Sequence, residues 1–307
     1  MTKKKVALAL SAGGAKGYAH IGVIKGLEEA GYEITSIAGT SMGALVGGLY
    51  AAGKLDEAYE WLKSITDWKV FKLADLKNLS HRGLIDGEYI FEELHKIVGD
   101  VRIENLPISF CCVAADLKTG EEKVFRSGRL LDAIRASVSM PVIFTPYAIR
   151  GKRYVDGGVV NGLPINHVKR RSGDELFAIN LDTYGKGVVT EIKDSSLFST
   201  DDLRKYMVQF ILPTFLPSNF FLKTLTTLMV AMVPRIWKEL FSENIITILL
   251  DSFYISLKQN KLKMVDMMKP DLYLNIDLKG YSTNNFSDAQ KIARLGYEQM
   301  CSELVRH

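Results

Sequence analysis

The chain has 307 residues, of which 47% are hydrophobic and 24% charged, and its 39 basic and 35 acidic side chains give a net charge of +4. Both fractions are near the globular average, which excludes disordered, collagen-like and coiled-coil chains, since each needs a strong compositional bias. The charge is too small to predict a nucleic-acid partner, but it leaves open a local attraction to anionic lipid.

The cysteines argue against a disulfide framework. There are three, an odd number, and Cys111 and Cys112 are adjacent in an apolar stretch. This pattern favours a reducing compartment. The sequence shows no metal-ligand motif, so we expect neither a metal nor another cofactor.

Two stretches imitate membrane signals. Lysines at 3–5 precede a short apolar run like that of a secretory leader, and residues 34–52 carry no charge over nearly the length of a bilayer span. The first run is too short for a leader and runs into glycines, which favours a buried strand. The second contains four glycines and is better explained by a strand, a turn and a buried helix. We therefore predict no transmembrane helix.

The first 52 residues alternate between strand and helix patterns. Apolar runs at 6–10 and 34–38 predict buried strands, and each is followed by glycines and a helix, over about 17–30 and up to about 52. Strand, helix, strand, helix is the pattern of a parallel sheet with helices on its faces.

The remainder of the chain continues this pattern less regularly. Residues 55–99 are predicted to be helical with interruptions, and 130–138 forms a helix that ends before Pro141. Strands are expected at 108–114, 121–125, 153–155, 176–181 and 271–278, the first two as a hairpin. Residues 206–268 are dense in Phe, Leu, Ile and Met, and Ser287 and Asp288 cap a last helix through Val305.

The strongest single motif is Gly39-Thr40-Ser41-Met42-Gly43, at a strand-to-helix turn. Small flanking residues permit a strained backbone that projects the serine hydroxyl, as in hydrolase nucleophiles, and the helix amino terminus favours developing negative charge. The alternative is a serine that merely caps the helix.

A glycine-rich loop, Ser11-Ala-Gly-Gly-Ala-Lys-Gly17, follows the first strand. Free amides at a helix start can bind an anion, so a dinucleotide site, a phosphate loop and an oxyanion hole all compete. The order Lys16-Gly17-Tyr18 does not fit a phosphate loop, and Ala12 replaces the first glycine of a dinucleotide fingerprint. An oxyanion hole needs only two amides beside the nucleophile.

A third motif is Asp156-Gly157-Gly158, where a carboxylate ends a predicted strand; a plain turn aspartate is the alternative. A hydrolase serine usually needs a histidine base. None of the five histidines is well placed by sequence: His20 suits a core or cap role and His167 a solvated surface.

In this order the three motifs resemble the patatin-like phospholipase family, over about residues 5–182. The segments around Ser137, Pro141 and Phe144 and from Asp156 to Pro164 extend the resemblance.

The resemblance implies a serine–aspartate dyad without histidine. Ser41 is then the nucleophile and Asp156 its base, with the amides of Gly13 and Gly14 as the oxyanion hole. The supporting motif positions are Ala12, Lys16, Gly17, Gly39, Gly43, Gly157 and Gly158. Ala12 departs from the family, which most often has a third glycine there. If that residue needs a positive φ, alanine would strain the loop.

We therefore expect a three-layer α/β/α fold with a mostly parallel central sheet. Residues 5–182 form the catalytic domain, and 183–307 a mainly helical elaboration whose closing strand and helix pack on the same domain. The expected function is hydrolysis of acyl esters of phospholipids or lysophospholipids through an acyl-enzyme.

The alternatives are an acyltransferase with the same dyad and a non-catalytic nucleotide-binding or scaffold protein. The expected partner is a lipid, with no nucleic acid and an undetermined oligomeric state. The default location is the cytoplasm with peripheral membrane contact, made by the apolar segment 206–268, for which an ordinary helical cap is the equal alternative.

Overall fold

The computed structural model describes residues 4–64, 87–141, 143–181, 245–281, 283 and 286–307, with side chains except at 64 and over 245–251. The chain divides into two compact units, one formed by Met1–Gly185 and Phe253–His307 and the other by Lys186–Ser252. The fold below is that of the first unit. The expected domain boundary at 182/183 stays a prediction, because residues 182–244 lie outside the described residues.

The centre of the first unit is a sheet of eight described strands in the order β5-β6-β3-β2-β1-β7-β8, with β4 paired to β3. The strands are β1 Lys4–Leu10, β2 Tyr32–Thr40, β3 Ser109–Asp116, β4 Glu122–Phe125, β5 Tyr147–Ile149, β6 Lys152–Asp156, β7 Glu175–Asn180 and β8 Leu272–Asn275. The run β3-β2-β1-β7-β8 is parallel, β4 and β6 each pair antiparallel with β3, and β5 pairs antiparallel with β6. The prediction of a mostly parallel sheet is confirmed.

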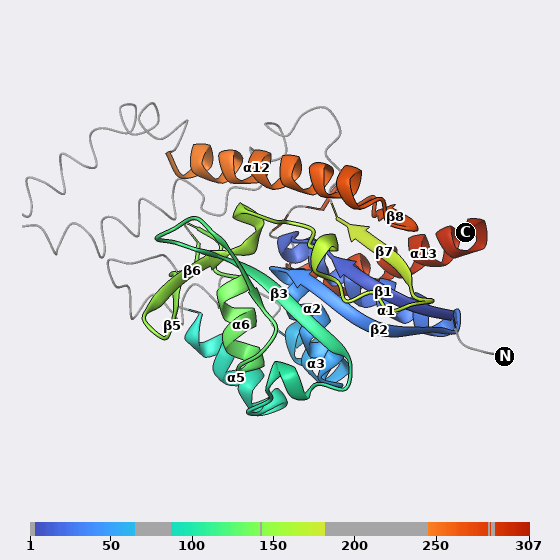
Figure 1. Cartoon of the computed structure of the whole chain (residues 1–307), viewed down its shortest axis with the longest axis horizontal. Helices are drawn as coiled ribbons and strands as arrows, with labels where there is room; N and C mark the ends of the chain where they lie inside the picture. Colours follow the sequence, from blue (N-terminus) through green and yellow to red (C-terminus); the bar gives the residue numbers. More distant parts are fainter. Residues whose placement is uncertain (1–3, 65–86, 142, 182–244, 282, 284–285) are drawn as a thin grey trace, which may run out of the picture. The chain divides into compact units, whose positions relative to one another are not determined.

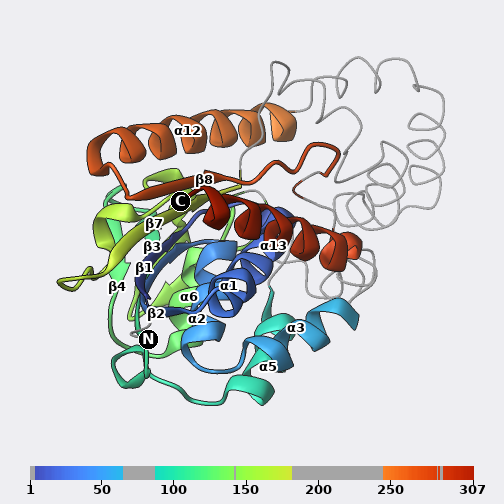
Figure 2. The same cartoon turned by 90° about the vertical axis from the view of Figure 1, so that its right-hand side faces the viewer.

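Helices cover both faces of this sheet (Figures 1 and 2). One face carries α1 Ala19–Glu29, α2 Met42–Ala51, α6 Leu130–Ser137 and α13 Ala289–Arg306, extended by α3 Leu55–Ser64 and α5 Glu88–Val98. The opposite face carries the part of α12 (Ile245–Met268) that belongs to this unit, where Met264 and Val265 pack on a small-residue strip that includes Ala7, Ala9 and Ala178. The three-layer α/β/α fold is therefore confirmed.

Several local details differ from the sequence prediction. The helix expected from residue 17 begins as a 3₁₀ turn, Gly14–Tyr18, and becomes α-helical at Ala19. The edge strand β5 was not predicted, because its three residues are too few to show a periodic pattern. The hairpin of β3 and β4 is confirmed.

The carboxyl-terminal elements are shorter or capped differently than expected. The strand expected over 271–278 is limited to Leu272–Asn275. Asp288 does occupy the N-cap position of α13, but its side chain makes no capping hydrogen bond and pairs with Lys291. Among the described residues, no helix combines the length and apolar character needed to cross a bilayer.

Helices α1 and α13 pack backbone to backbone through two glycines. A Cβ on Gly22 would lie 1.9 Å from the carbonyl oxygen of Ala293, and one on Gly296 would lie 2.1 Å from that of Ala19. Because neither neighbour is a flexible side chain, any added atom must separate the helices. This contact anchors the chain's last helix to its first.

The first prediction follows from this contact. Gly296→Ala should lower the free energy of unfolding by about 2 kcal/mol, the usual cost of overpacking, despite alanine's better helix propensity. Chemical denaturation of the variant measures it, with Gln290→Ala, at an exposed position of the same helix, as control. A midpoint for Gly296→Ala equal to that of the control would contradict the close contact.

Candidate active site

The loops after β1 and β2 lie side by side at one edge of the sheet. The two strands are parallel neighbours, with Leu10 opposite Gly39, so the glycine loop and the Ser41 turn leave the sheet together. Asp156 comes to the same edge from the other direction, because β6 runs antiparallel to β3 and places it opposite Ala114. Sheet topology thus brings together three motifs that are far apart in the sequence.

Ser41 has a strained backbone and a hydroxyl directed at a carboxylate. Its φ of 55° and ψ of −122° place it where non-glycine residues are rare, at a cost of about 1–3 kcal/mol. The Oγ donates a 2.6 Å hydrogen bond to Oδ2 of Asp156, and the backbone N–H donates to Oγ of Ser137 at 2.9 Å. Although Ser41 precedes α2, its side chain makes no capping bond. The capping alternative is therefore wrong.

The glycines around Ser41 allow close backbone approach. A Cβ on Gly43 would lie 2.3 Å from the carbonyl oxygen of Leu10, and one on Gly39 would lie 2.4 Å from that of Gly43. These contacts press the start of α2 against β1 and the end of β2. Any larger side chain would push the Ser41 turn away from the glycine loop.

Asp156 is almost fully buried, and each of its carboxylate oxygens has a partner. Oδ2 accepts from Ser41, and Oδ1 accepts from the N–H of Gly158 at 2.7 Å. Burial raises the pKa of Asp156 to about 6, against the opposing hydrogen bonds from Ser41 and Gly158 and the charge of Lys261. The turn-aspartate alternative therefore accounts for only one of the two carboxylate oxygens. Oδ1 stabilises the turn through Gly158, and Oδ2 binds Ser41.

Gly157 and Gly158 begin the 3₁₀ turn Gly157–Val159 and are buried. A Cβ on Gly157 would lie 2.2 Å from the carbonyl oxygen of Val113, so the chain after Asp156 is pressed against β3.

The glycine loop has one residue that requires glycine's conformational freedom, and it is not residue 12. Gly14 has φ +57°, whereas Gly13 is extended with φ −179°. Ala12 is not among the described residues with positive φ, so alanine causes no strain there. Within the described part of the chain, the N–H groups of Gly13 and Gly14 donate to no other residue. Two backbone donors are thus available at this edge of the sheet.

The other two motif residues of the loop are buried in the 3₁₀ turn. A Cβ on Gly17 would lie 2.3 Å from Cβ of Met42, which fixes the loop against the start of α2. Lys16 is 4% exposed, and its charge is among the causes that lower the pKa of Asp277.

An apolar cavity adjoins Ser41. Besides Ser41, its lining is hydrophobic or aromatic: Tyr18, Met42, Leu45, Leu62, Ile90, Phe91, Leu94, Val138, Met140, Phe144 and Phe286. These residues come mainly from α2, α3, α5 and the segment after α6. The cavity therefore lies on the face of the sheet that carries these helices, opposite α12. Such a lining suits a hydrocarbon chain and disfavours a charged ligand.

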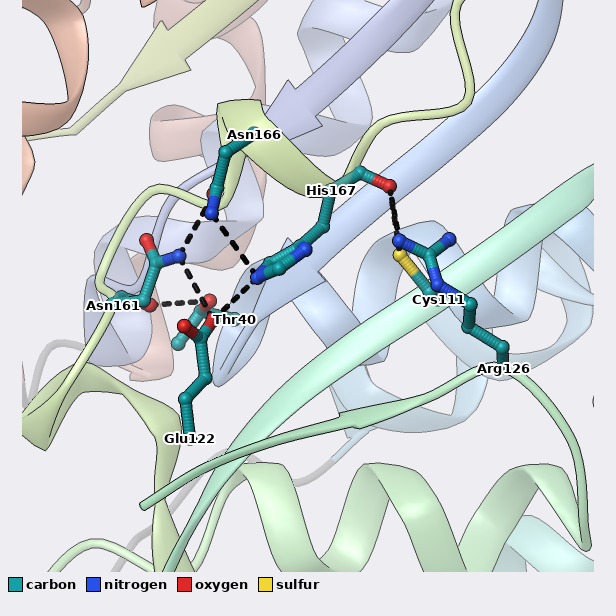
Figure 3. A network of polar contacts seen from close by, with 7 residues as sticks. All are labelled: Thr40, Cys111, Glu122, Arg126, Asn161, Asn166 and His167. Atoms are coloured by element: carbon teal, nitrogen blue, oxygen red, sulfur yellow. Dashed lines mark hydrogen bonds and ion pairs between the residues drawn. The ribbon is translucent and has the colours of Figure 1, made fainter. Parts of the chain in front are cut away.

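A polar network supports the site from the other side (Figure 3). Thr40 donates to the carbonyl oxygen of Asn161 at 2.8 Å, and the Asn161 amide donates to Glu122 at 2.9 Å and to Asn166 at 3.0 Å. The imidazole Nε2 of His167 lies 2.7 Å from the same Glu122 oxygen. The network therefore joins the residue before Ser41 to the loop that follows Asp156.

The main-chain oxygen of His167 is also held, by Arg126 at 2.9 Å and by the Cys111 thiol at 3.4 Å (Figure 3). The prediction of a solvated His167 needs correction, because its side chain is only 20% exposed. Burial alone would raise the pKa of Glu122, but the hydrogen bonds from His167 and Asn161 outweigh it and lower that pKa.

His20 is a core residue, as predicted. It is fully buried, and its Nε2 bonds to the carbonyl oxygen of Ser11 at 2.9 Å. Burial lowers its pKa to about 4, so the ring is neutral at physiological pH. In the described part of the chain, no histidine forms a hydrogen bond with Ser41 or Asp156.

Sequence reasoning missed three residues that contact the site: Ser137, Asn161 and Lys261. Ser137 and Asn161 stand within segments that carried the family resemblance, but no pattern assigned them a contact. Lys261 belongs to no sequence motif. Its position on a helix far along the chain does not indicate that it contacts the glycine loop. Among the described residues, no three His, Cys, Asp or Glu side chains are grouped to hold a metal.

The chain is similar to known proteins over more than half of its length. A family model described as patatin-like phospholipase matches residues 8–169, which include Gly13, Gly14, Ser41 and Asp156. An uncharacterized NTE family protein of Mycobacterium tuberculosis is 45% identical over 177 residues, 58% of this chain and 49% of that protein.

Eukaryotic relatives are more distant. Lysophospholipase nte1 of Emericella nidulans is 32% identical over 186 residues, 58% of this chain and 12% of its own length. Patatin-like phospholipase domain-containing protein 6 of Mus musculus is 31% identical over 202 residues, 60% of this chain and 15% of its own. The chain thus spans at most about half the length of these relatives.

The second prediction concerns the buried carboxylate. Because the pKa of Asp156 is raised to about 6, the folded state binds its proton more tightly than the unfolded state. Stability from this group is present at low pH and is lost as the pH rises from about 4 through about 6. Asp156→Asn keeps a neutral group of the same shape and should be more stable than wild type at pH 8, by an amount on the order of 3 kcal/mol.

Denaturation midpoints of both proteins at pH 4.5 and pH 8 measure this effect. The advantage of Asp156→Asn should be much smaller at pH 4.5. His20, with its lowered pKa, changes the stability in the opposite direction over this range but contributes equally to both proteins. An equal difference at the two pH values would mean that Asp156 is not desolvated in its charged form.

Proposed function

Because the chain belongs to the patatin-like phospholipase family, we propose that it hydrolyses carboxylic esters of lipids, with Ser41 as nucleophile and Asp156 as general base. The observation that carries the proposal is the 2.6 Å hydrogen bond from the hydroxyl of strained Ser41 to a buried carboxylate. A serine hydroxyl becomes an effective nucleophile when an adjacent base can accept its proton.

The proposed reaction has two halves. Ser41 Oγ attacks the ester carbonyl carbon while its proton moves to Asp156 Oδ2, and the resulting oxyanion accepts hydrogen bonds from the Gly13 and Gly14 amides. Collapse of this intermediate breaks the ester C–O bond, and the leaving alcohol takes the proton from Asp156. Water then attacks the acyl-enzyme by the same route and releases the fatty acid.

Asp156 is suited to this task by its environment. An ordinary aspartate, with a pKa near 3.9, is a weak base toward a hydroxyl. Burial raises the pKa of Asp156 to about 6, which strengthens it as a base while leaving it mostly ionised at neutral pH. Histidine is not needed in this scheme, and the neutral, buried His20 stays a structural residue.

The substrate class follows from the apolar cavity beside Ser41. Its aliphatic and aromatic lining supports an acyl chain as the group that enters, placing the ester carbonyl at Ser41 Oγ. Phospholipids and lysophospholipids are the proposed substrates, in line with the names of the fungal and mouse relatives. An acyltransferase would use the same dyad, with an alcohol in place of water.

The third prediction tests the dyad. Treatment with a fluorophosphonate should add one adduct to wild type and none to Ser41→Ala, as measured by intact mass. Hydrolysis of a lysophospholipid should fall by at least about 10³-fold in Ser41→Ala and in Asp156→Asn, because the two groups act as a unit. Activity of wild type should rise with pH through about 6, as Asp156 ionises.

His167→Ala is the control, because the dyad mechanism requires no histidine and this variant should keep most of the activity. A folded His167→Ala protein as inactive as Ser41→Ala would contradict the mechanism. Chromatography of the products with an added alcohol acceptor separates hydrolysis from acyl transfer.

Peripheral contact with an anionic membrane is the proposed location of this activity. Of the apolar segment 206–268 expected to make this contact, residues 206–244 lie outside the described residues, and the remainder forms α12. A second candidate surface is a cleft of about 610 Å³ beside the β5–β6 hairpin. Its cationic lining residues are Arg102, Lys123, Arg129, Arg150 and Lys152, and Asp132 is the one acidic residue among the described residues that line it.

The cleft and the site share strand β6. Lys152 begins β6 and Asp156 ends it, which places them roughly 13 Å apart along the strand. The hairpin extends beyond the carboxyl ends of β1 and β2 (Figure 1). Three of the cations pair with acids: Arg102 with Glu104, Arg129 with Asp100 and, more loosely, Lys152 with Asp116. The cationic lining of the cleft supports contact with lipid phosphates.

The fourth prediction tests this surface. Arg150 has φ +51° in the hairpin turn, a conformation that asparagine adopts more readily, so Arg150→Asn should fold well. The double variant Lys123→Gln/Arg150→Asn should bind vesicles with 30% phosphatidylglycerol about tenfold or more weakly, since each basic side chain contributes about 1 kcal/mol near such a surface.

The matched control removes two charges elsewhere, with Lys25→Gln and Lys291→Gln on the outer helices α1 and α13. Vesicle sedimentation should show near wild-type binding for this control. Equal loss in both double variants would mean that only net charge matters, and the cleft would then have no special role.

A further inference from the structure

Helix α12 contacts two of the three segments that form the site, the glycine loop and the chain that follows Asp156. Leu257 is buried, and its side chain lies so close to Gly158 and Gly162 that a Cβ on Gly162 would be 2.2 Å from its Cδ1. Asn260 donates to the carbonyl oxygen of Val159 at 3.1 Å. One face of α12 therefore packs along the chain that follows Asp156.

Lys261 extends this contact to the glycine loop. Its side chain is 1% exposed, and Nζ donates a 2.7 Å hydrogen bond to the carbonyl oxygen of Ala12. The aliphatic part passes Gly162, where a Cβ would lie 3.1 Å from Cγ and Cε of Lys261. Burial of an ammonium group costs several kcal/mol unless hydrogen bonds compensate it. A leucine or methionine would fill the same space without that cost.

The two peptides that meet at Ala12 are each held. The N–H of Ala12, in the Ser11–Ala12 peptide, donates to the carbonyl oxygen of Gly162 at 2.9 Å. The carbonyl oxygen of Ala12, in the Ala12–Gly13 peptide, accepts from Lys261 at 2.7 Å and from the Ser11 hydroxyl at 3.1 Å. A trans peptide is planar, and its C=O and N–H point in opposite directions. The structure has no cis peptide bond in its described residues, so fixing the Ala12 oxygen toward α12 fixes the Gly13 N–H to point away from α12.

The hydrogen bond also changes the strength of that donor. A cation at the carbonyl oxygen polarises the whole amide, which makes the N–H at its other end a better hydrogen-bond donor. The same positive charge favours ionised Asp156, although burial remains the dominant influence on that carboxyl's pKa.

We propose that Lys261 is a positioning residue that aims and polarises the Gly13 N–H through the Ala12 carbonyl. It touches neither Ser41 nor the substrate in this role. The inference rests on the proposed function in that the Gly13 N–H is taken as an oxyanion donor. The fixed geometry of the Ala12–Gly13 peptide can be tested without any reaction.

The fifth prediction has a kinetic part. Lys261→Met replaces the ammonium with an apolar group of similar length and should lower kcat by about 10- to 100-fold with little change in KM, somewhat less than loss of a whole oxyanion donor. The rate of fluorophosphonate addition to Ser41 should fall in parallel. Lys263→Met, at an exposed position of the same helix, should behave as wild type. Lys261→Gln keeps a neutral donor and separates hydrogen bonding from charge.

The second part observes the peptide itself. The chain has four Ala–Gly bonds, after Ala12, Ala30, Ala38 and Ala52. With carbonyl-¹³C alanine and ¹⁵N glycine, an HNCO spectrum contains only these four signals, and Ala12→Ser identifies the Ala12–Gly13 signal by its loss. In Lys261→Met this signal should shift while the other three stay, and in Lys263→Met none should move.

The two parts separate the possible failures. An unchanged Ala12–Gly13 signal in folded Lys261→Met, or in Lys261→Gln should the methionine variant not fold, would overturn the inference whether or not the chain is an esterase. A shifted signal with an unreactive wild-type Ser41 would support the positioning contact and reject the proposed function. A shifted signal with wild-type kcat would overturn the catalytic consequence of the contact.

Discussion

The arrangement of the site depends on one short hydrogen bond, between the hydroxyl of Ser41 and the carboxylate of Asp156. The two residues are 115 positions apart; Ser41 directly follows β2, and Asp156 ends β6. They meet because the sheet reverses direction between β3 and β6, so that one strand delivers its carboxyl end where the parallel strands deliver theirs. The antiparallel strands at this side of the sheet are therefore what allows the contact.

Burial makes Asp156 a stronger base in this bond, and it also lowers the stability of the fold. A carboxylate with 1% exposure and a pKa raised to about 6 destabilises the fold at neutral pH, and a serine at φ 55° adds backbone strain. The surrounding structure offsets both. Ser137 holds the Ser41 N–H, Gly158 holds the second carboxylate oxygen, and the Asn161–Glu122–His167 network holds the loop between them. These neighbours form a rigid frame around a strained pair.

The sequence was sufficient for the local parts of this picture. Short apolar runs followed by glycines predicted β1, β2 and the helices after them, because a buried parallel strand and a tight turn leave strong local patterns. The same motifs indicated Ser41, Asp156 and the glycine loop. The question raised by Ala12 needed coordinates: a sequence does not reveal which loop residue takes the positive φ, and here it is Gly14. His167 was misjudged because the adjacent basic residues suggested a solvated surface, whereas Glu122 lies on a distant strand.

Contacts between distant segments are where sequence reasoning ends, and Lys261 illustrates why. A lysine on a helix normally signals a solvated face, and nothing near residue 261 suggests a buried carbonyl 249 positions earlier. Gly162 provides the missing half of the explanation. It is the residue that lets α12 approach closely enough for Lys261 to reach Ala12, and its own carbonyl accepts from the Ala12 N–H in the preceding peptide. Gly162 and Lys261 thus hold the glycine loop together, through their two hydrogen bonds with Ala12. Replacing either should therefore disturb the same Gly13 amide, one through the backbone and the other through the side chain.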